Sequence, residues 1–196
     1  TATDPVIASV ASGVSQIFYG VDGAAYQPFT SGFTLTEGVH TIRYFSKDNV
    51  GNTEITHSIT ISVDATPSVT TSSFGNPVVN AFTSTFISPN TPITLSATDT
   101  LSGVKRTEFR VTGDQPTGNY TSFVNYTVPI KLADIVISSA ITGTFNIEFR
   151  SIDNVENIES VKTKTVQVSV VQDLALVGIE NVRLNGQSQV TGNVRS

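Results

Sequence analysis

Asp and Asn residues gather in a short motif that the chain contains twice, and their oxygen atoms could bind a cation. The motif reads Asp-Asn-Val-Gly-Asn at residues 48–52 and Asp-Asn-Val-Glu-Asn at residues 153–157. Carboxylate and amide oxygens are ligands that calcium prefers. The same side chains also bond to their own backbone and close tight turns. The motif therefore predicts either a calcium site or a structural turn, and both interpretations stay open.

Each motif follows a segment in which apolar or small residues occupy every second position. A period of two predicts a β-strand with one buried face, not a helix. The alternating residues are His40, Ile42, Tyr44 and Ser46 in the first copy, and Phe145, Ile147, Phe149 and Ser151 in the second. The two strands are expected to place their motifs at equivalent points of one repeated fold.

Further matches in the same order predict that the whole fold is duplicated. The matched segments are residues 1–4 with 96–99, residues 12–14 with 102–104, Ile17, Tyr19 and Val21 with Thr107, Phe109 and Val111, and Ile59, Ile61 and Val63 with Val166, Val168 and Val170. The second copy carries an insertion at about residues 114–143. Within it, residues 129–140 fit either a short helical turn or an added edge strand. We favour irregular structure followed by a strand, because the β-branched run Ile135-Val136-Ile137 disfavours a helix.

The second copy also has a Pro-rich leading segment, residues 65–95, that the first copy lacks. We therefore predict a first domain at residues 1–64, truncated at its N-terminal side, and a second at residues 65–172. Residues 173–196 match neither copy and are predicted to be a tail or the start of another element.

Composition narrows the classes of function. The 196 residues carry a net charge of −5 with no Lys/Arg cluster, which gives nucleic-acid binding no electrostatic basis. No apolar run approaches the roughly 20 residues of a membrane span, so membrane insertion is not expected. Cys is absent, which excludes disulfides and thiol chemistry. Only 14% of residues are charged, and a surface of Thr, Ser, Asn and Gly is typical of an extracellular β protein.

Taken together, these motifs resemble the tandem bacterial Ig-like repeats of secreted and cell-surface proteins. The resemblance rests on TLSATDTLSGV at residues 94–104, on the strand that ends in Ser-x-Asp-Asn-Val-x-Asn, and on Val-Asp-Ala-Thr-Pro at residues 63–67. It covers about residues 1–172 and departs at Glu156, where the family usually has Gly. It implies an all-β chain of tandem antiparallel β-sandwiches, the first without its opening strand, and no catalytic residues.

In such a sandwich the B–C and F–G loops lie at one end. Asp99 would end strand B, and the motif at residues 153–157 would be the F–G turn. The resemblance thus implies a calcium site at the joint between the domains, formed by Asp64, Asp99, Asp153 and Asn154. The matching set in the first copy is Asp4, Asp48 and Asn49. Calcium is the only cofactor expected.

Two further groups of side chains were considered for chemistry or binding. His40 and His57 occupy apolar-phase positions of predicted strands and are interpreted as packing residues. Neither a Ser-His-Asp arrangement with a strained Ser turn nor a phosphate-binding Gly loop is present, so the chain is not expected to be an enzyme. Tyr120 and Tyr126 lie in the insertion and are candidates for an exposed aromatic surface that contacts glycans.

The sequence therefore predicts a non-catalytic structural module of an extracellular or cell-surface protein, acting as a rod-like spacer or an assembly unit. Its partners would be neighbouring copies or domains of the same protein, and surface glycans. One alternative is a subunit of a self-assembling fibre, in which the apolar segment at residues 174–182 of one copy fills the place of the missing strand in another. The other alternative is a carbohydrate-binding module appended to a secreted enzyme.

Overall fold

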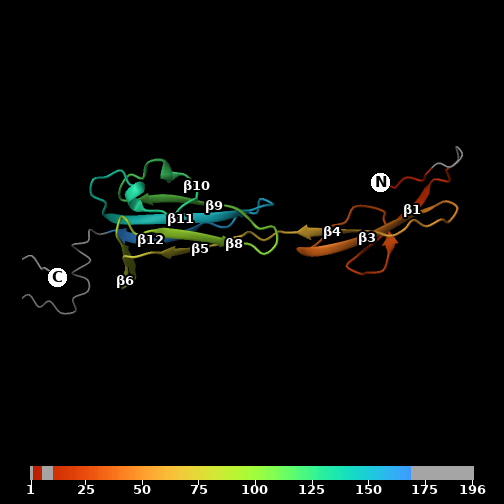
Figure 1. Ribbon diagram of the computed structural model, residues 1–196, viewed down its shortest axis with the longest axis horizontal. Coiled ribbons are helices and arrows are strands. Elements are labelled where there is room, and N and C mark those ends of the chain that lie inside the picture. The colour runs from red at the N-terminus through yellow and green to blue at the C-terminus, as the bar shows by residue number, and fades with distance from the viewer. Residues whose placement is uncertain (1, 6–10, 169–196) are drawn as a thin grey trace, which may run out of the picture. The chain divides into compact units, whose positions relative to one another are not determined.

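The structure, a computed structural model, describes residues 2–5 and 11–168, and these residues form an all-β protein (Figure 1). In this part of the chain the only helices are two short 3₁₀ turns, η1 (Gly118–Thr121) and η2 (Leu132–Asp134), and no helix could cross a membrane. The predicted tail at residues 173–196, including residues 174–182, lies outside the described residues.

The chain divides into two compact units. Unit 1 comprises residues Thr1–Val69, Ala97–Arg106 and Ser151–Glu159. Unit 2 comprises residues Thr70–Ser96, Thr107–Arg150 and those from Ser160 onward. Both copies of the Asp-Asn motif belong to unit 1. The domain boundaries drawn from the sequence stay a prediction.

Unit 1 contains one four-stranded antiparallel sheet in the order β2-β1-β3-β4. Its strands are β1 (Val14–Val21), β2 (Gln27–Pro28), β3 (Gly38–Asp48) and β4 (His57–Val63). In the register of the sheet, Tyr19 lies opposite Tyr44 and Ile42 lies opposite Ile59. Residues directly opposite each other share a face, so these apolar side chains line one side of the sheet.

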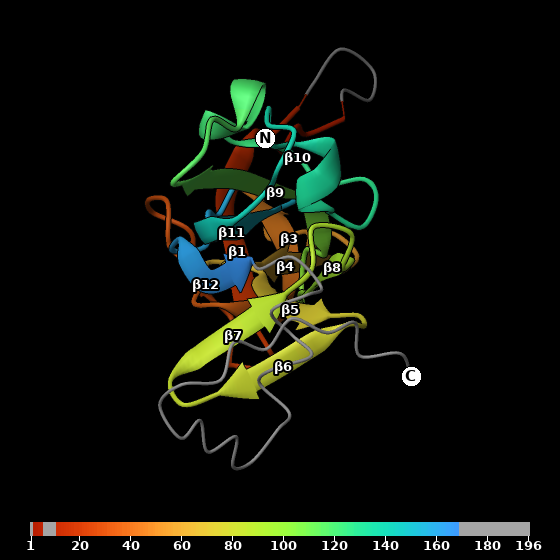
Figure 2. The same cartoon turned by 90° about the vertical axis from the view of Figure 1, so that its left-hand side faces the viewer.

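Unit 2 is built mainly from a six-stranded sheet in the order β10-β9-β11-β12-β7-β6 and a separate two-stranded sheet, β5-β8. The pairs β9–β10, β11–β12 and β6–β7 are antiparallel, whereas β12 and β7 pair in parallel. Figure 2 shows the β6–β7 hairpin on one side of the unit and the insertion with its helical turns on the other. The strands are β5 (Val69–Phe74), β6 (Val78–Ala81), β7 (Ser84–Ile87), β8 (Ile93–Thr98), β9 (Val104–Gly113), β10 (Val124–Asn125), β11 (Gly143–Asp153) and β12 (Lys162–Val168).

The hydrophobic core lies in unit 2. The alternating residues Phe145, Ile147 and Phe149 of β11 are buried there, between residues from both sheets and from the insertion. Burial of each such side chain is worth about 1.5–3 kcal/mol. The other core members are Ile87, Ile93, Leu95, Phe109, Val111, Ile130, Leu132, Ile135, Val136, Val166 and Val168.

The expected strand at residues 135–137 is wrong. Helix η2 ends in a turn in which the Val136 amide donates to the Leu132 carbonyl at 2.9 Å. Leu132, Ile135 and Val136 all reach the core from this turn. The gain from packing therefore outweighs the strand preference of β-branched residues.

The register corrects one detail of the repeat. Ile61 lies opposite His40 in the first sheet, and Val166 lies opposite Phe145 in the second. Since His40 and Phe145 are equivalent, Ile61 and not Ile59 is the counterpart of Val166. The sequence match was wrong by two residues, a shift that keeps the same face of the strand.

Candidate cation site and the repeated turn

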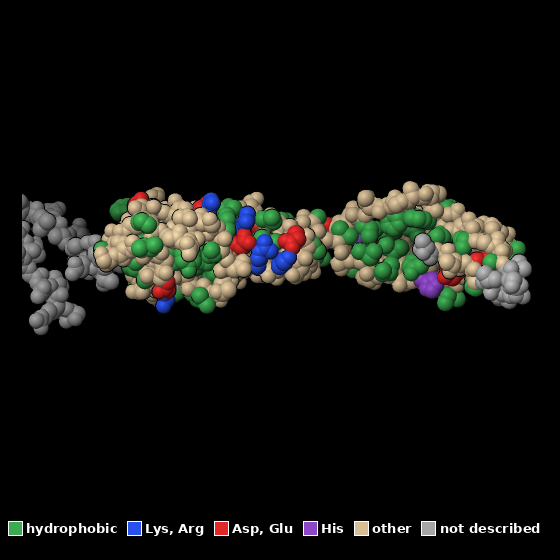
Figure 3. Space-filling view, turned by 90° about the horizontal axis from the view of Figure 1, so that it is seen from above, with side chains coloured by type: hydrophobic (Ala, Val, Ile, Leu, Met, Phe, Trp, Pro, Cys, Tyr) green, Lys and Arg blue, Asp and Glu red, His purple; other side chains and the backbone are tan. Residues whose placement is uncertain are grey.

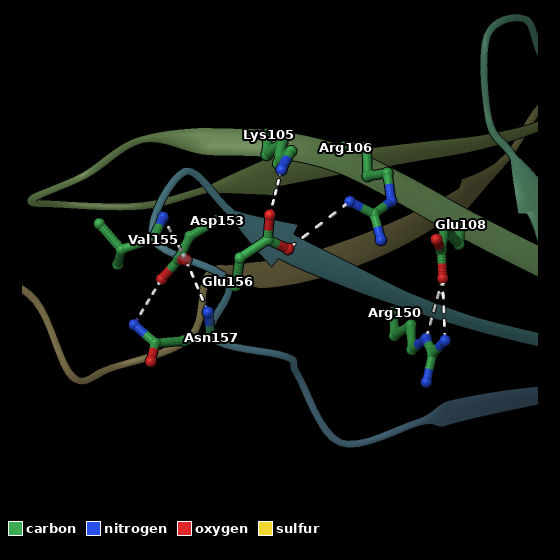
Figure 4. A network of polar contacts seen from close by, with 8 residues as sticks. All are labelled: Lys105, Arg106, Glu108, Arg150, Asp153, Val155, Glu156 and Asn157. Atoms are coloured by element: carbon green, nitrogen blue, oxygen red, sulfur yellow. Dashed lines mark hydrogen bonds and ion pairs between the residues drawn. The ribbon is translucent and has the colours of Figure 1, made fainter.

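The two Asp-Asn motifs form the same turn through the same bonds. Asp48 Oδ1 accepts from the backbone amides of Val50 at 3.0 Å and Asn52 at 2.8 Å, and its Oδ2 accepts from Asn52 Nδ2 at 2.7 Å. Asp153 makes the corresponding bonds to Val155 and Asn157 at 3.0, 2.8 and 2.7 Å (Figure 4). The first Asp of the motif is therefore the acceptor around which the turn closes.

The Asn that follows ties each turn to a second loop. Asn49 donates from its backbone amide to the Gly13 carbonyl at 3.0 Å and from Nδ2 to the Ser12 carbonyl at 2.7 Å. Asn154 contacts the matching loop, with 3.0 Å to Gly103 and 2.8 Å to the Ser102 carbonyl. Gly13 and Gly103 have φ of 83° and 81°, and a Cβ atom there would approach the Asn nitrogen to 3.2 Å. Both features favour glycine at this position.

A Ser–Glu pair completes each turn, and the sequence analysis missed it. Glu54 accepts from the backbone and hydroxyl of Ser46 at 3.0 and 2.8 Å. Glu159 accepts from Ser151 in the same way at 3.0 and 3.1 Å. Comparison of the two copies could have revealed this pair, because both place Ser two residues before the Asp and Glu six residues after it.

Three of the expected calcium ligands come together in unit 1. Carboxylate oxygens of Asp64, Asp99 and Asp153 lie within 4.8 Å of one another, and Asp153 is fully buried. Asn157 Nδ2 also donates to the Asp64 carbonyl at 3.2 Å, which links the segment before β5 to the turn. Asn154, the fourth expected ligand, uses its side-chain nitrogen on the 102–103 loop.

Backbone amides already bond to each of these carboxylates. Asp99 Oδ1 accepts from Leu101 and Gly103 at 3.0 and 2.8 Å. Asp64 accepts from the amides of Thr66 and Ser102 at 3.1 and 2.9 Å. Hydrogen bonding to the side chain and backbone of Ser102 and to the backbone of Thr66 lowers the pKa of Asp64, against the effect of desolvation. Three ionised carboxylates at this distance repel one another, and either these N–H groups or a cation can offset the repulsion.

The cluster can therefore supply three oxygen ligands toward the six to eight that calcium takes. Two basic side chains meet Glu156, the residue between Val155 and Asn157 in the turn: Lys105 contacts its carboxylate and Arg106 lies 3.9 Å from it (Figure 4). Figure 4 also shows a separate ion pair, Arg150 with Glu108 at 3.0 Å. Calcium binding stays a prediction.

The matching set in the first copy contains fewer carboxylates. Asp4 and Asp48 line one pocket of about 270 Å³. Asp4 Oδ2 accepts from the Gly13 amide at 2.8 Å, as Asp99 does from Gly103. Burial raises the pKa of Asp48, but hydrogen bonds from Asn52, Ser12 and Val50 together lower it below its usual value. This set contains two carboxylates, and Asn49 donates from Nδ2 to the neighbouring loop.

The two insertion tyrosines pack inward. Tyr120 stacks on Phe109 with ring centroids 5.7 Å apart, and Tyr126 meets Phe109 edge-to-face at 6.3 Å. Both rings are half-buried against the core. The Phe109 ring covers one face of Tyr120, and the glycan role stays a prediction.

The His40 ring makes two hydrogen bonds and is therefore more than a packing residue. Its Nδ1 lies 2.7 Å from Asp22 Oδ2, and its Nε2 lies 2.9 Å from the Thr36 carbonyl. Both partners can only accept, so both ring nitrogens must donate and the ring carries a positive charge when both bonds form. The Asp22 carboxylate, with the Thr36 carbonyl, accordingly raises the pKa of His40 against desolvation. His57 lies 3.0 Å from Glu54 on the exposed side of the turn.

No protein-family model matches this chain, and no curated protein sequence matches it.

Proposed function

We propose that this chain is a non-catalytic structural module of an extracellular bacterial protein, built from tandem Ig-like repeats and acting as a spacer or assembly unit. The observation that carries the proposal is the repeated turn. In both copies the polar side chains of the motif are engaged in bonds that hold one loop to another, with distances that agree within about 0.1 Å.

Such bonds suit a structural role better than a catalytic one. A catalytic carboxylate or amide needs a free edge toward a substrate, whereas Asp48 and Asp153 use both oxygens on their own turn. Closed loops joined by several charge-assisted hydrogen bonds also resist local opening. The proposal follows from what these side chains already do.

The composition and the sheets support the remaining parts of the proposal. The surface is rich in Thr, Ser and Asn and poor in charge, which suits an extracellular β protein. In unit 2, residues of β8 pack against residues of β11 across the core, as two layers of a sandwich would. The Ig-like assignment itself rests on the order of the motifs.

Single-molecule pulling tests the spacer role. With a handle at each end of the chain, we expect a constant folded length under load, followed by abrupt unfolding steps. Gradual lengthening at low force, without steps, would contradict a spacer. The location is tested separately by whether an antibody against the chain labels intact cells of its host; labelling only after lysis would contradict an extracellular site.

A further inference from the structure

One face of the β1-β3-β4 sheet carries apolar side chains that the described residues leave open. Tyr44 and Ile59 are 40% and 49% exposed, although they lie on the face shared by Tyr19 and Ile42. Phe29 and Phe33 stand around Tyr19, with Phe33 stacked on its ring at 4.4 Å. Figure 3 shows hydrophobic side chains gathered into a patch over this unit. An apolar patch of this kind marks a docking surface.

The equivalent face in unit 2 shows what covers such a surface. There Phe109, Ile147 and Val166 occupy the positions of Tyr19, Ile42 and Ile61, and all are buried. Their cover includes Ile93 and Leu95 of β8, which are themselves buried in the same core. Strand β8 pairs with β5, so the cover has two strands.

In unit 1, residues 2–4 correspond to residues 97–99, where β8 ends. Asp4 accepts from the Gly13 amide at 2.8 Å, as Asp99 does from the Gly103 amide at 2.8 Å. Since β8 runs directly into Asp99, Ala2 corresponds to Ala97 near the end of that strand. Ala2 lines the apolar pocket of about 270 Å³ together with Ile17, Tyr19, Ile42 and Tyr44. A strand leading into Ala2 would therefore continue across the open face.

We propose that the open face binds a two-stranded β cover with the sequence pattern of β5 and β8, joined to Ala2 on its N-terminal side. Its inward positions take apolar side chains at a period of two, as Ile93 and Leu95 do, because the pocket is lined mainly by aromatic and aliphatic groups. The inference deepens the proposed structural role and rests on the relationship between the repeats.

A chain that carries a second copy of residues 65–95 fused ahead of Thr1 tests this proposal. We expect amide hydrogen exchange in β1, β3 and β4 to slow by about tenfold or more, and binding of a hydrophobic dye to fall. The matched control carries Ile93→Asp and Leu95→Asp in the added copy only, and should behave like the chain without the extension. Exchange in β11 reports whether each chain remains folded.

Unchanged exchange and dye binding in the extended chain, with β11 still protected, would overturn the proposal. So would protection of the face in the chain without the extension through dimers or filaments, measured by sedimentation and electron microscopy, because a second copy would then be the cover. Neither result would alter the pulling behaviour that tests the spacer role, so the two proposals can fail separately.

Discussion

The β1-β3-β4 sheet and the β9-β11-β12 sheet share one alternating pattern but differ in burial. Ile42 is half-buried in the first sheet, whereas Ile147 at the same position of the second is fully buried. Both segments are strands of 11 residues that end in the same turn. Local sequence thus determines the strand, and the residues packed across from it determine whether that strand contributes a core.

The two turns also differ in the burial of their polar side chains. Their hydrogen bonds agree, yet Asp153 is 0% exposed and Glu159 is 8% exposed, while the Glu54 side chain is 40% exposed. In the second copy Ser68, from the segment before β5, donates to Ser151 at 2.8 Å within a buried site. Water can replace a lost bond at the first turn far more readily than at the second.

The largest expected effect follows from the difference between the sheets. Ile147→Ala should lower the free energy of unfolding of unit 2 by about 2–5 kcal/mol, because it leaves a cavity in a packed core. Ile42→Ala removes the same atoms from an open face and should cost clearly less. Chemical denaturation of both variants measures the difference. Equal losses would show that the first face is covered in solution.

The second expected effect separates the two turns. Asp153→Ala removes a fully buried acceptor from the part-buried bonds of the Val155 and Asn157 amides, and should cost about 1–3 kcal/mol. Asp48→Ala is the matched control, and a smaller loss is expected because water reaches that turn. Thermal unfolding, with hydrogen exchange at residues 155 and 157, would detect the change. A larger loss at Asp48 would contradict this comparison.

Several features could be predicted from the sequence because they depend on local pattern. Alternation identified the strands that carry Ile42 and Ile147. The resemblance to Ig-like repeats, which rests on the ordered motifs, implied that Asp64, Asp99 and Asp153 converge. The structure brings these carboxylates within 4.8 Å. That expectation came from the loop arrangement that the resemblance to Ig-like repeats implies, and not from the local pattern alone.

Other features depend on contacts that a sequence does not display. The run at residues 135–137 forms a turn because the core takes up Ile135 and Val136 there. Tyr120 is half-buried because Phe109 lies beneath it. The role of Glu54 and Glu159 follows from bonds across eight residues, which strand periodicity does not indicate. For Ile135, Val136 and Tyr120, tertiary packing decided the outcome, whereas the Ser–Glu pairs could have been found only by comparing the two copies.

Calcium is expected to distinguish the two acidic sets. An ion held by Asp64, Asp99 and Asp153 should stabilise the fold by about 1.4 kcal/mol at a tenfold excess of calcium over its Kd. We expect a higher Tm in calcium than in chelator, and loss of that difference in Asp99→Asn. Asp4→Asn, at the two-carboxylate set, is the control that should keep it. An identical Tm in calcium and in chelator would show that the three carboxylates form turns and do not bind calcium.

A smaller effect is expected where the turns differ in sequence. Gly51 has φ of 94° and Glu156, its counterpart, has φ of 73°. Gly51→Glu places a side chain in left-handed backbone and should destabilise the first turn by about 1 kcal/mol. Glu156→Gly relieves this strain but loses the contacts with Lys105 and Arg106, so its net change should be under about 0.5 kcal/mol. A stabilised Gly51→Glu variant, seen by thermal unfolding, would contradict this account.

The smallest expected effect concerns His40, whose counterpart in the second sheet is Phe145. Its two hydrogen bonds require the protonated ring, and Asp22 raises the pKa of His40 above its usual 6.5. A raised folded-state pKa contributes stability that is fully present below pH 6.5 and is lost as the pH rises through the folded pKa. We therefore expect the first sheet to weaken above neutral pH, and His40→Phe to remove that dependence. Titration of the ring by NMR, together with hydrogen exchange in β3 between pH 6 and 8, measures both; a ring that titrates below pH 6.5 would refute the charged pair.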